Sequence, residues 1–170
     1  MQAPHPFITV GRLRDALGDV RGRRVLEVGP GTGYYTLPVA GWVGPEGRLD
    51  IFDVQQEMLD HTMARARERG LANVQPTRGD ARSLPYADAS FDAAYLVTVL
   101  GEIPDQEQAL RELRRVLTPD GRLVVGELWG DPHVVTAGSL RERGAAAGLQ
   151  FERRVGPAFG FFAVLRPAPG

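Results

Sequence analysis

Apolar residues along the chain fall into short runs that alternate with longer segments of helical spacing. The short runs are rich in branched residues and are bounded by Gly, Pro or Asp, a pattern typical of strands. Strands that alternate with helices predict a parallel sheet covered by helices. The five expected parallel strands are Arg24–Val28, Leu49–Phe52, Val74–Thr77, Ala93–Val97 and Arg122–Val125.

Two of the longer segments have the features of amphipathic helices. Gln56–Arg69 carries apolar residues at helical spacing, and Gly70 follows it as a stop signal. Asp105–Leu117 begins with an acidic residue and has arginines near its end, which suits the helix dipole. Thr118–Gly121 then predicts a turn before the fifth strand.

The C-terminal part differs from the rest of the pattern. It predicts a helix over Ser139–Ala147, a stop at Gly148, and two further apolar runs, Phe151–Val155 and Phe159–Leu165. The link between these two runs is too short to contain a crossover helix. The last strand is therefore expected to run antiparallel to its predecessor or to leave the sheet.

Length and charge narrow the class of protein. A chain of 170 residues has the size of one domain, and 43% hydrophobic with 24% charged residues is typical of a globular protein. The basic residues are all arginine and nearly balance 21 acidic residues, for a net charge of -1. This balance argues against general nucleic-acid binding. Arginine clusters at 12–24 and 65–69 fit an anionic partner or a solvated helix face, and the solvated face is favoured.

The absence of cysteine excludes disulfides, a thiolate nucleophile and cysteine metal ligands, and it fits a reducing compartment. The apolar runs are shorter than the roughly 20 residues of a membrane helix. The first residues lack the pattern of a signal peptide. We therefore expect a cytoplasmic protein without a metal site or a membrane partner.

The first strand runs directly into a loop with glycines at 29, 31 and 33. In open α/β sheets, ligands bind beyond the carboxyl ends of the strands, and glycine lets the backbone approach them. Tyr34 stands where the dinucleotide fingerprint requires its third glycine, and Pro30 removes an N–H that a pyrophosphate would need. The loop therefore predicts a ligand without phosphates, with a plain tight turn as the alternative.

Acidic residues stand at or just after the ends of the first three strands. Glu27 could attract an ammonium group or be a solvated strand-end carboxylate. Asp53 lies 20 residues after Gly33, where it can accept hydrogen bonds from both ribose hydroxyls, and the nearby Asp50 is expected on the opposite face. Asp80 could hold an adenine amine or make a turn.

Taken together, Glu27-Val-Gly-Pro-Gly-Thr-Gly33, Asp53, Gly79-Asp-Ala81 and Leu117-Thr-Pro-Asp-Gly-Arg-Leu123 resemble the class I S-adenosylmethionine-dependent methyltransferases. The similarity covers roughly residues 21–166 and is greatest to small bacterial proteins related to the ubiquinone and menaquinone C-methyltransferases. It implies a Rossmann-like three-layer α/β/α sandwich. Its seven-stranded, mostly parallel sheet would have the order 3-2-1-4-5-7-6 with strand 7 antiparallel. Residues 21–170 would form the cofactor-binding domain, and residues 1–20 a helical segment that could act as a lid.

The resemblance implies transfer of a methyl group from S-adenosylmethionine to a small-molecule acceptor by in-line displacement, leaving S-adenosylhomocysteine. Alternatives are a catalytically silent cofactor-binding module and, further off, a nicotinamide-dependent oxidoreductase. Weak candidates for removing a proton from the acceptor are Tyr34, Tyr35, Glu102 and His133. Cofactor contacts are implied for Glu27, Gly29, Gly31, Gly33, Asp53, Val54, Met58, Asp80, Ala81 and Thr98.

The acceptor side offers little material for a pocket. Phe7, Trp129 and the Phe159–Phe162 cluster could help to close it, or could belong to the core. From this we expect an open site for a small, partly apolar acceptor.

Overall fold

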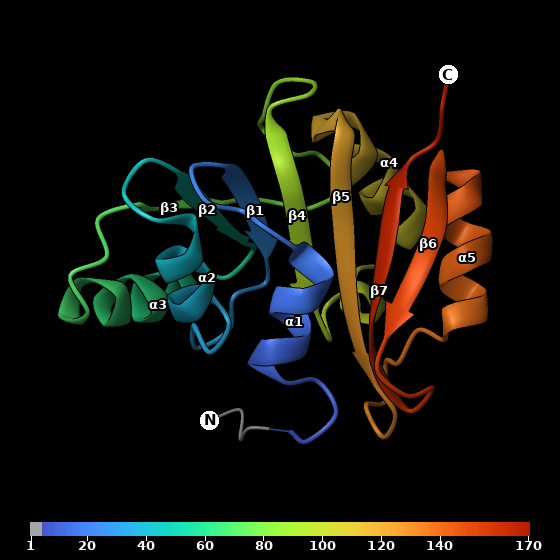
Figure 1. Cartoon of the computed structure of the whole chain (residues 1–170), viewed down its shortest axis with the longest axis horizontal. Coiled ribbons are helices and arrows are strands. Elements are labelled where there is room, and N and C mark those ends of the chain that lie inside the picture. Colours follow the sequence, from blue (N-terminus) through green and yellow to red (C-terminus); the bar gives the residue numbers. More distant parts are fainter. Residues whose placement is uncertain (1–4) are drawn as a thin grey trace.

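The computed structural model describes residues 5–170, and residues 1–4 of the expected N-terminal segment lie outside the described part. Strands and helices alternate over residues 10–128 except between β3 and β4, broadly as the apolar pattern predicts (Figure 1). The strands are β1 (Arg24–Val28), β2 (Arg48–Asp53), β3 (Val74–Arg78), β4 (Phe91–Val97), β5 (Leu117–Leu128), β6 (Leu149–Val155) and β7 (Gly160–Pro167). The helices are α1 (Val10–Leu17), α2 (Thr36–Val43), α3 (Gln56–Glu68), α4 (Gln106–Val116) and α5 (Ala137–Ala146), with a short 3-10 turn at Leu100–Glu102.

The seven strands form one sheet of order β3-β2-β1-β4-β5-β7-β6, which confirms the expected topology. Strands β1 to β5 pair in parallel, and β7 runs antiparallel to both β5 and β6. Four residues, 156–159, connect β6 to β7. Because a parallel neighbour needs a crossover, this short link fixes β7 as the antiparallel strand.

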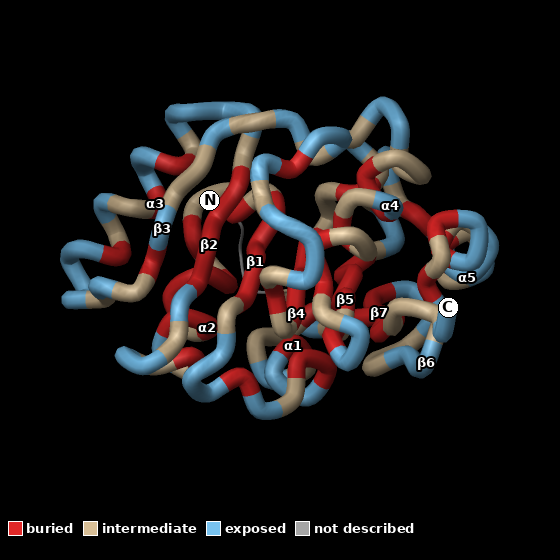
Figure 2. The backbone as a smooth tube through the Cα atoms, turned by 90° about the horizontal axis from the view of Figure 1, so that it is seen from above, coloured by how far each residue is buried: buried red, intermediate tan, exposed pale blue. Residues whose placement is uncertain are grey.

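Helices cover both faces of the sheet (Figure 2). The buried side chains of α1, α2 and α3 pack with one set of strand residues, and those of α4 and α5 pack with the other. No helix connects β3 to β4; the segment 79–90 crosses that part of the second face and buries Leu84 there. None of the helices within residues 5–170 has the length and apolar character that crossing a membrane requires.

Two local features differ from the expectation. Helix α2 was not predicted, because Thr36–Val43 is apolar on nearly every side and contains Pro38. Proline is tolerated there because it lies in the first turn, where its missing N–H has no intrahelical partner. The expected turn at Thr118–Gly121 lies inside β5, where the register with β4 shifts between Phe91 and Ala93.

Candidate functional site

A cavity of about 540 Å³ opens where β1, β2, β3 and β4 reach their carboxyl ends. This volume is in the range of small-molecule sites, and its position is the one where open α/β sheets bind ligands. Seven of the ten expected cofactor contacts line it: Gly29, Gly31, Asp53, Val54, Asp80, Ala81 and Thr98. The cavity is also lined by Val28, Phe52, Gln55, Gly79, Arg82, Val97, Val99, Glu102, Ile103, Pro104 and Asp131.

The glycine loop forms one wall of the cavity. Gly31 has a φ of +57°, and a Cβ on it would meet no atom within 4 Å, so its backbone faces open space. Gly29 has a φ of +73°, and a Cβ there would lie 2.5 Å from the Val99 side chain. The loop is fixed from outside, because the Thr62 hydroxyl of α3 donates a hydrogen bond to the Gly31 carbonyl at 2.9 Å. The sequence therefore builds a rigid loop with its main chain presented to a ligand.

Glu27 lies beneath this loop and is buried, so it is not a solvated strand-end carboxylate. The Thr36 hydroxyl donates a hydrogen bond to its carboxylate at 2.5 Å. Burial raises the pKa of Glu27 to about 7, against the lowering effect of that hydrogen bond. Glu27 does not line the cavity, and it ties the end of β1 to the start of α2.

Asp53 and Asp50 take different places although they stand three residues apart on β2. Asp53 lines the cavity, and one of its carboxylate oxygens accepts a hydrogen bond from the Gln55 backbone at 2.8 Å. Asp50 is fully buried and paired with Arg24 at 3.2 Å and Arg48 at 2.8 Å. Of the two, Asp53 is therefore the carboxylate available to a ligand in the cavity.

The third strand delivers Asp80 and Ala81 to the same cavity. The Asp80 carboxylate is paired with Arg82, whose Nη2 lies 2.6 Å from Oδ2. The segment 79–90 that carries them is held by Arg115 of α4, which donates hydrogen bonds to the carbonyls of Leu84 and Tyr86 at 2.9 and 2.8 Å. A helical side chain thus fixes a segment that has no regular structure of its own.

Thr98 follows β4 and adopts a backbone conformation that is rare for its type. Its φ is +54°, and a β-branched residue pays steric strain in this left-handed region. Its amide donates to the Gly126 carbonyl of β5 at 2.8 Å, which holds the turn in place. With this backbone conformation, Thr98 and Val99 line the cavity in the short link between β4 and the 3-10 turn.

The segment after β5 forms the far side of the cavity through Asp131. Glu127, which the sequence analysis did not single out, lies under this segment and is buried. One of its oxygens accepts a hydrogen bond from the Val135 amide at 3.1 Å, and the other has no partner among the described residues. Burial raises the pKa of Glu127 to about 7. An acidic residue inside an apolar strand was the signal that could have identified it.

Three of the four candidates for proton removal, Tyr34, Tyr35 and His133, do not line the cavity. The Tyr35 hydroxyl is buried and donates to the Ile8 carbonyl at 2.6 Å, and Tyr34 packs edge-to-face on the Tyr35 ring. The His133 amide donates to the Asp131 carboxylate at 2.7 Å, but His133 does not line the cavity. Among the four candidates for proton removal, Glu102 does line it. The other expected cofactor contacts outside the lining are Gly33 and Met58.

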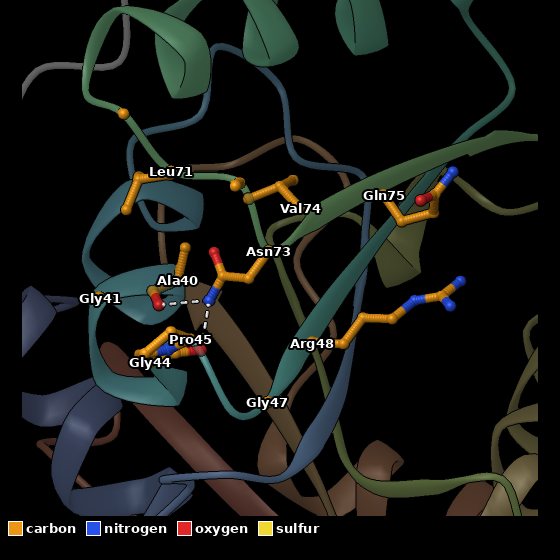
Figure 3. Close-up of a pocket in the computed structure, with 12 residues that line it drawn as sticks. Ala40, Gly41, Gly44, Pro45, Gly47, Arg48, Leu71, Asn73, Val74 and Gln75 are labelled. Atoms are coloured by element: carbon orange, nitrogen blue, oxygen red, sulfur yellow. Dashed lines mark hydrogen bonds between the residues drawn. The ribbon is translucent and has the colours of Figure 1, made fainter.

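A second hollow of about 490 Å³ lies near the amino ends of β2 and β3 (Figure 3). The Asn73 side chain lines this hollow, and its amide donates hydrogen bonds to the carbonyls of Ala40 and Gly44 at the end of α2. Its wall is largely glycine and aliphatic carbon, and its charged residue, Arg48, is paired with Asp50. In the part of the chain that is described, no cluster of three or more His, Asp or Glu side chains could hold a metal ion.

Comparison with known proteins assigns the family. A model of the methyltransferase domain family matches residues 25–121, which span β1 to the middle of β5 and include most of the cavity wall. The chain belongs to the methyltransferase domain family. The ubiquinone/menaquinone biosynthesis C-methyltransferase UbiE of Ectopseudomonas mendocina is 40% identical over 118 residues, 68% of this chain. That match covers 46% of UbiE, so the chain spans about half the length of the curated relatives it matches.

Solved structures share the fold over nearly the whole chain. A SAM-dependent methyltransferase from Aquifex aeolicus superimposes with a TM-score of 0.85 at 23% identity, over 94% of this chain and 89% of the other. The [4+2]-cyclase SpnF superimposes with a TM-score of 0.82 at 25% identity, over 95% of this chain and 81% of the other. The likeness in fold therefore extends over nearly the whole chain.

Proposed function

We propose that this protein is an S-adenosylmethionine-dependent methyltransferase that acts on a small molecule. The observation that carries the proposal is the single cavity that joins Gly29 and Gly31, Asp53 and Asp80 across the carboxyl ends of three strands. A nucleoside with an amino-acid tail needs these three contacts: main chain for the tail, a carboxylate for the ribose, and an acceptor for the adenine amine.

The charge of the cavity supports a cationic ligand. Its charged lining residues are Asp53, Asp80, Glu102 and Asp131, with Arg82 as the basic one. Because Arg82 is paired with Asp80, the remaining field is negative. Such a field attracts a sulfonium and an ammonium group and repels a pyrophosphate. The same reasoning disfavours a nicotinamide dinucleotide as the ligand.

The residues present fit the cofactor part by part. The amino-acid tail would lie along the main chain of Gly29 and Gly31. At Gly31 this main chain faces open space. Asp53 would accept from the ribose hydroxyls. Val54, which is 63% exposed at the cavity edge, would cover the adenine together with Ala81. When bound, the cofactor would supply a methyl group activated by the positive sulfonium.

The chain's own contribution to methyl transfer would be alignment and exclusion of water. Thr98 and Val99 line the cavity, and the Val99 side chain lies against Gly29, so they would set the direction from which an acceptor approaches. Glu102 lines the cavity and is the residue best placed to take a proton from an acceptor oxygen or nitrogen.

We propose an acceptor that is small and partly apolar. Trp129 and Phe159 are 68% and 46% exposed at the same edge of the sheet, and the Trp129 amide donates to the Phe159 carbonyl. Phe7 packs edge-to-face on Phe159 at 4.7 Å. Residues 5–20 would thus act as a partial lid, held in place by the hydrogen bond that the Tyr35 hydroxyl donates to the Ile8 carbonyl. The three rings would supply apolar surface beside a polar cavity.

Turnover distinguishes an enzyme from a silent cofactor-binding module. The protein is incubated with S-adenosylmethionine and a panel of small phenols, amines and hydroquinones, and S-adenosylhomocysteine is measured together with the mass of the acceptor. A mass gain of one methylene group with stoichiometric release supports the proposal. Binding of S-adenosylmethionine without release for any acceptor supports the silent module, and binding of NADH in its place supports an oxidoreductase.

The likeness to SpnF, a [4+2]-cyclase, is the reason to measure acceptor mass as well as cofactor consumption. A rearranged acceptor of unchanged mass would assign a different reaction to the same fold.

A further inference from the structure

The carboxylate of Asp80 accepts hydrogen bonds on both oxygens from a single residue, Arg82. Oδ1 accepts hydrogen bonds from the Arg82 backbone amide at 2.9 Å and from Arg82 Nε at 3.0 Å. Oδ2 accepts from Nε at 3.1 Å and from Nη2 at 2.6 Å. An ionised carboxylate offers roughly four lone-pair sites. Because the single Nε–H is shared between the two oxygens, three N–H groups of Arg82 occupy most of the acceptor capacity that an adenine amine would use.

The pair lies in the place where the nucleoside is proposed to bind. Asp80 and Arg82 both line the cavity, with side chains that are 48% and 42% exposed. The hydrogen bonds from Arg82 lower the pKa of Asp80 to about 2, so the carboxylate is ionised at neutral pH. Protonation therefore does not release Arg82, and a ligand has to displace it.

We propose that Arg82 competes with the adenine amine for Asp80 and thereby lowers the affinity of the site for its cofactor. The inference rests on the proposed function, because it takes Asp80 as the adenine acceptor. Exposed ion pairs contribute little free energy, since water screens them and ordered side chains lose entropy. The pair is therefore weak enough to open when the nucleoside binds, and strong enough to reduce its affinity.

The surrounding structure lets the Arg82 side chain move without the main chain. The Arg82 carbonyl accepts a hydrogen bond from the Gln108 side chain at 3.1 Å, which anchors the backbone of this residue to α4. The pKa of the Arg82 guanidinium is raised, mainly by its hydrogen bonds to Asp80. The negative charge of Asp105, at the start of α4, also raises this pKa. Because the Arg82 side chain is 42% exposed, water solvates the displaced guanidinium, so opening the pair does not strand a charge.

Calorimetric titration with S-adenosylhomocysteine tests the competition without any acceptor. Arg82→Gln removes the competing charge, and the expected result is binding about two- to five-fold tighter than in the wild type. Arg67→Gln, an exposed position on α3 outside the cavity, gives the same change of net charge and is expected to leave the affinity unchanged. Asp80→Asn is expected to weaken binding. In the Asp80→Asn background, Arg82→Gln is expected to give no gain.

Three results would overturn the inference. Equal or weaker binding by Arg82→Gln would show that the pair does not oppose the ligand. An equal gain in the Asp80→Asn background would show that Arg82 acts through its charge alone and not through Asp80. Failure of the wild type to bind S-adenosylhomocysteine would remove the inference and the proposed function together. If the wild type binds and Arg82→Gln gives no gain, the inference fails while the proposed function stands. Thermal unfolding of each variant confirms that the fold is intact.

Discussion

Two acidic residues in this fold are buried without a basic partner among the described residues. Glu27 accepts a hydrogen bond from Thr36, and Glu127 accepts one from the Val135 amide. Burial raises the pKa of each from 4.5 to about 7. Both lie at the carboxyl ends of their strands, close to the cavity, where a fold optimised for stability alone would place apolar side chains.

These raised pKa values predict how stability depends on pH. Between pH 4.5 and pH 7 the folded protein keeps protons on Glu27 and Glu127 that the unfolded chain has lost, so the free energy of unfolding falls as pH rises through this window. Above about pH 7 both states are ionised and this contribution levels off. Urea unfolding at pH 5 and pH 8 measures the fall, which is expected to be smaller in Glu27→Gln and in Glu127→Gln. If both variants lose as much stability between pH 5 and pH 8 as the wild type, the pH dependence does not come from Glu27 and Glu127.

At the scale of elements, helix α4 holds the segment between β3 and β4. Arg115 donates to the carbonyls of Leu84 and Tyr86 and pairs with Glu112 of its own helix at 2.7 Å. Since no helix connects the two strands, these contacts replace the packing that a crossover helix would supply. They also hold the part of the chain that brings Asp80 and Ala81 to the cavity.

Removing this contact is expected to affect both stability and binding. Arg115→Gln should lower the free energy of unfolding by about 1–3 kcal/mol, because two partly buried carbonyls lose a charged donor. It should also weaken S-adenosylhomocysteine binding, since segment 79–90 loses its support. Urea unfolding and calorimetry measure the two effects. Arg111→Gln removes a surface pair with Glu107 and an exposed hydrogen bond to the Gln108 side chain, both on the same helix, and is expected to change stability by less than about 0.5 kcal/mol. Equal effects of the two variants would contradict the role of Arg115.

Most of the architecture could be predicted because apolar periodicity and link length determine it. The five parallel strands follow from short branched runs, and the antiparallel β7 follows from the four-residue link after β6. Helix α2 escaped prediction because it has no polar face, and periodicity is informative only where a helix has one apolar and one polar side.

The cavity lining was predictable to a similar degree, since strand ends and a glycine loop place Gly29, Asp53 and Asp80 at neighbouring strand ends. The pairing of Asp80 with Arg82 and the position of Glu127 under the last loop depend on side-chain directions that spacing does not encode. Of the four candidates for proton removal, Tyr35 shows the same limit, because its hydroxyl points into the core.

At the scale of the whole molecule, the sheet brings three strand ends together so that one ligand can span them. We propose that S-adenosylmethionine lies there with its ribose on Asp53. Calorimetric titration of S-adenosylmethionine into the wild type, Asp53→Ala and the exposed α3 control Asp60→Ala tests it directly. Binding by the wild type and by Asp60→Ala, with a loss of about 1–3 kcal/mol in Asp53→Ala, is the predicted result. Undiminished affinity in Asp53→Ala, or no binding by the wild type, would contradict the account.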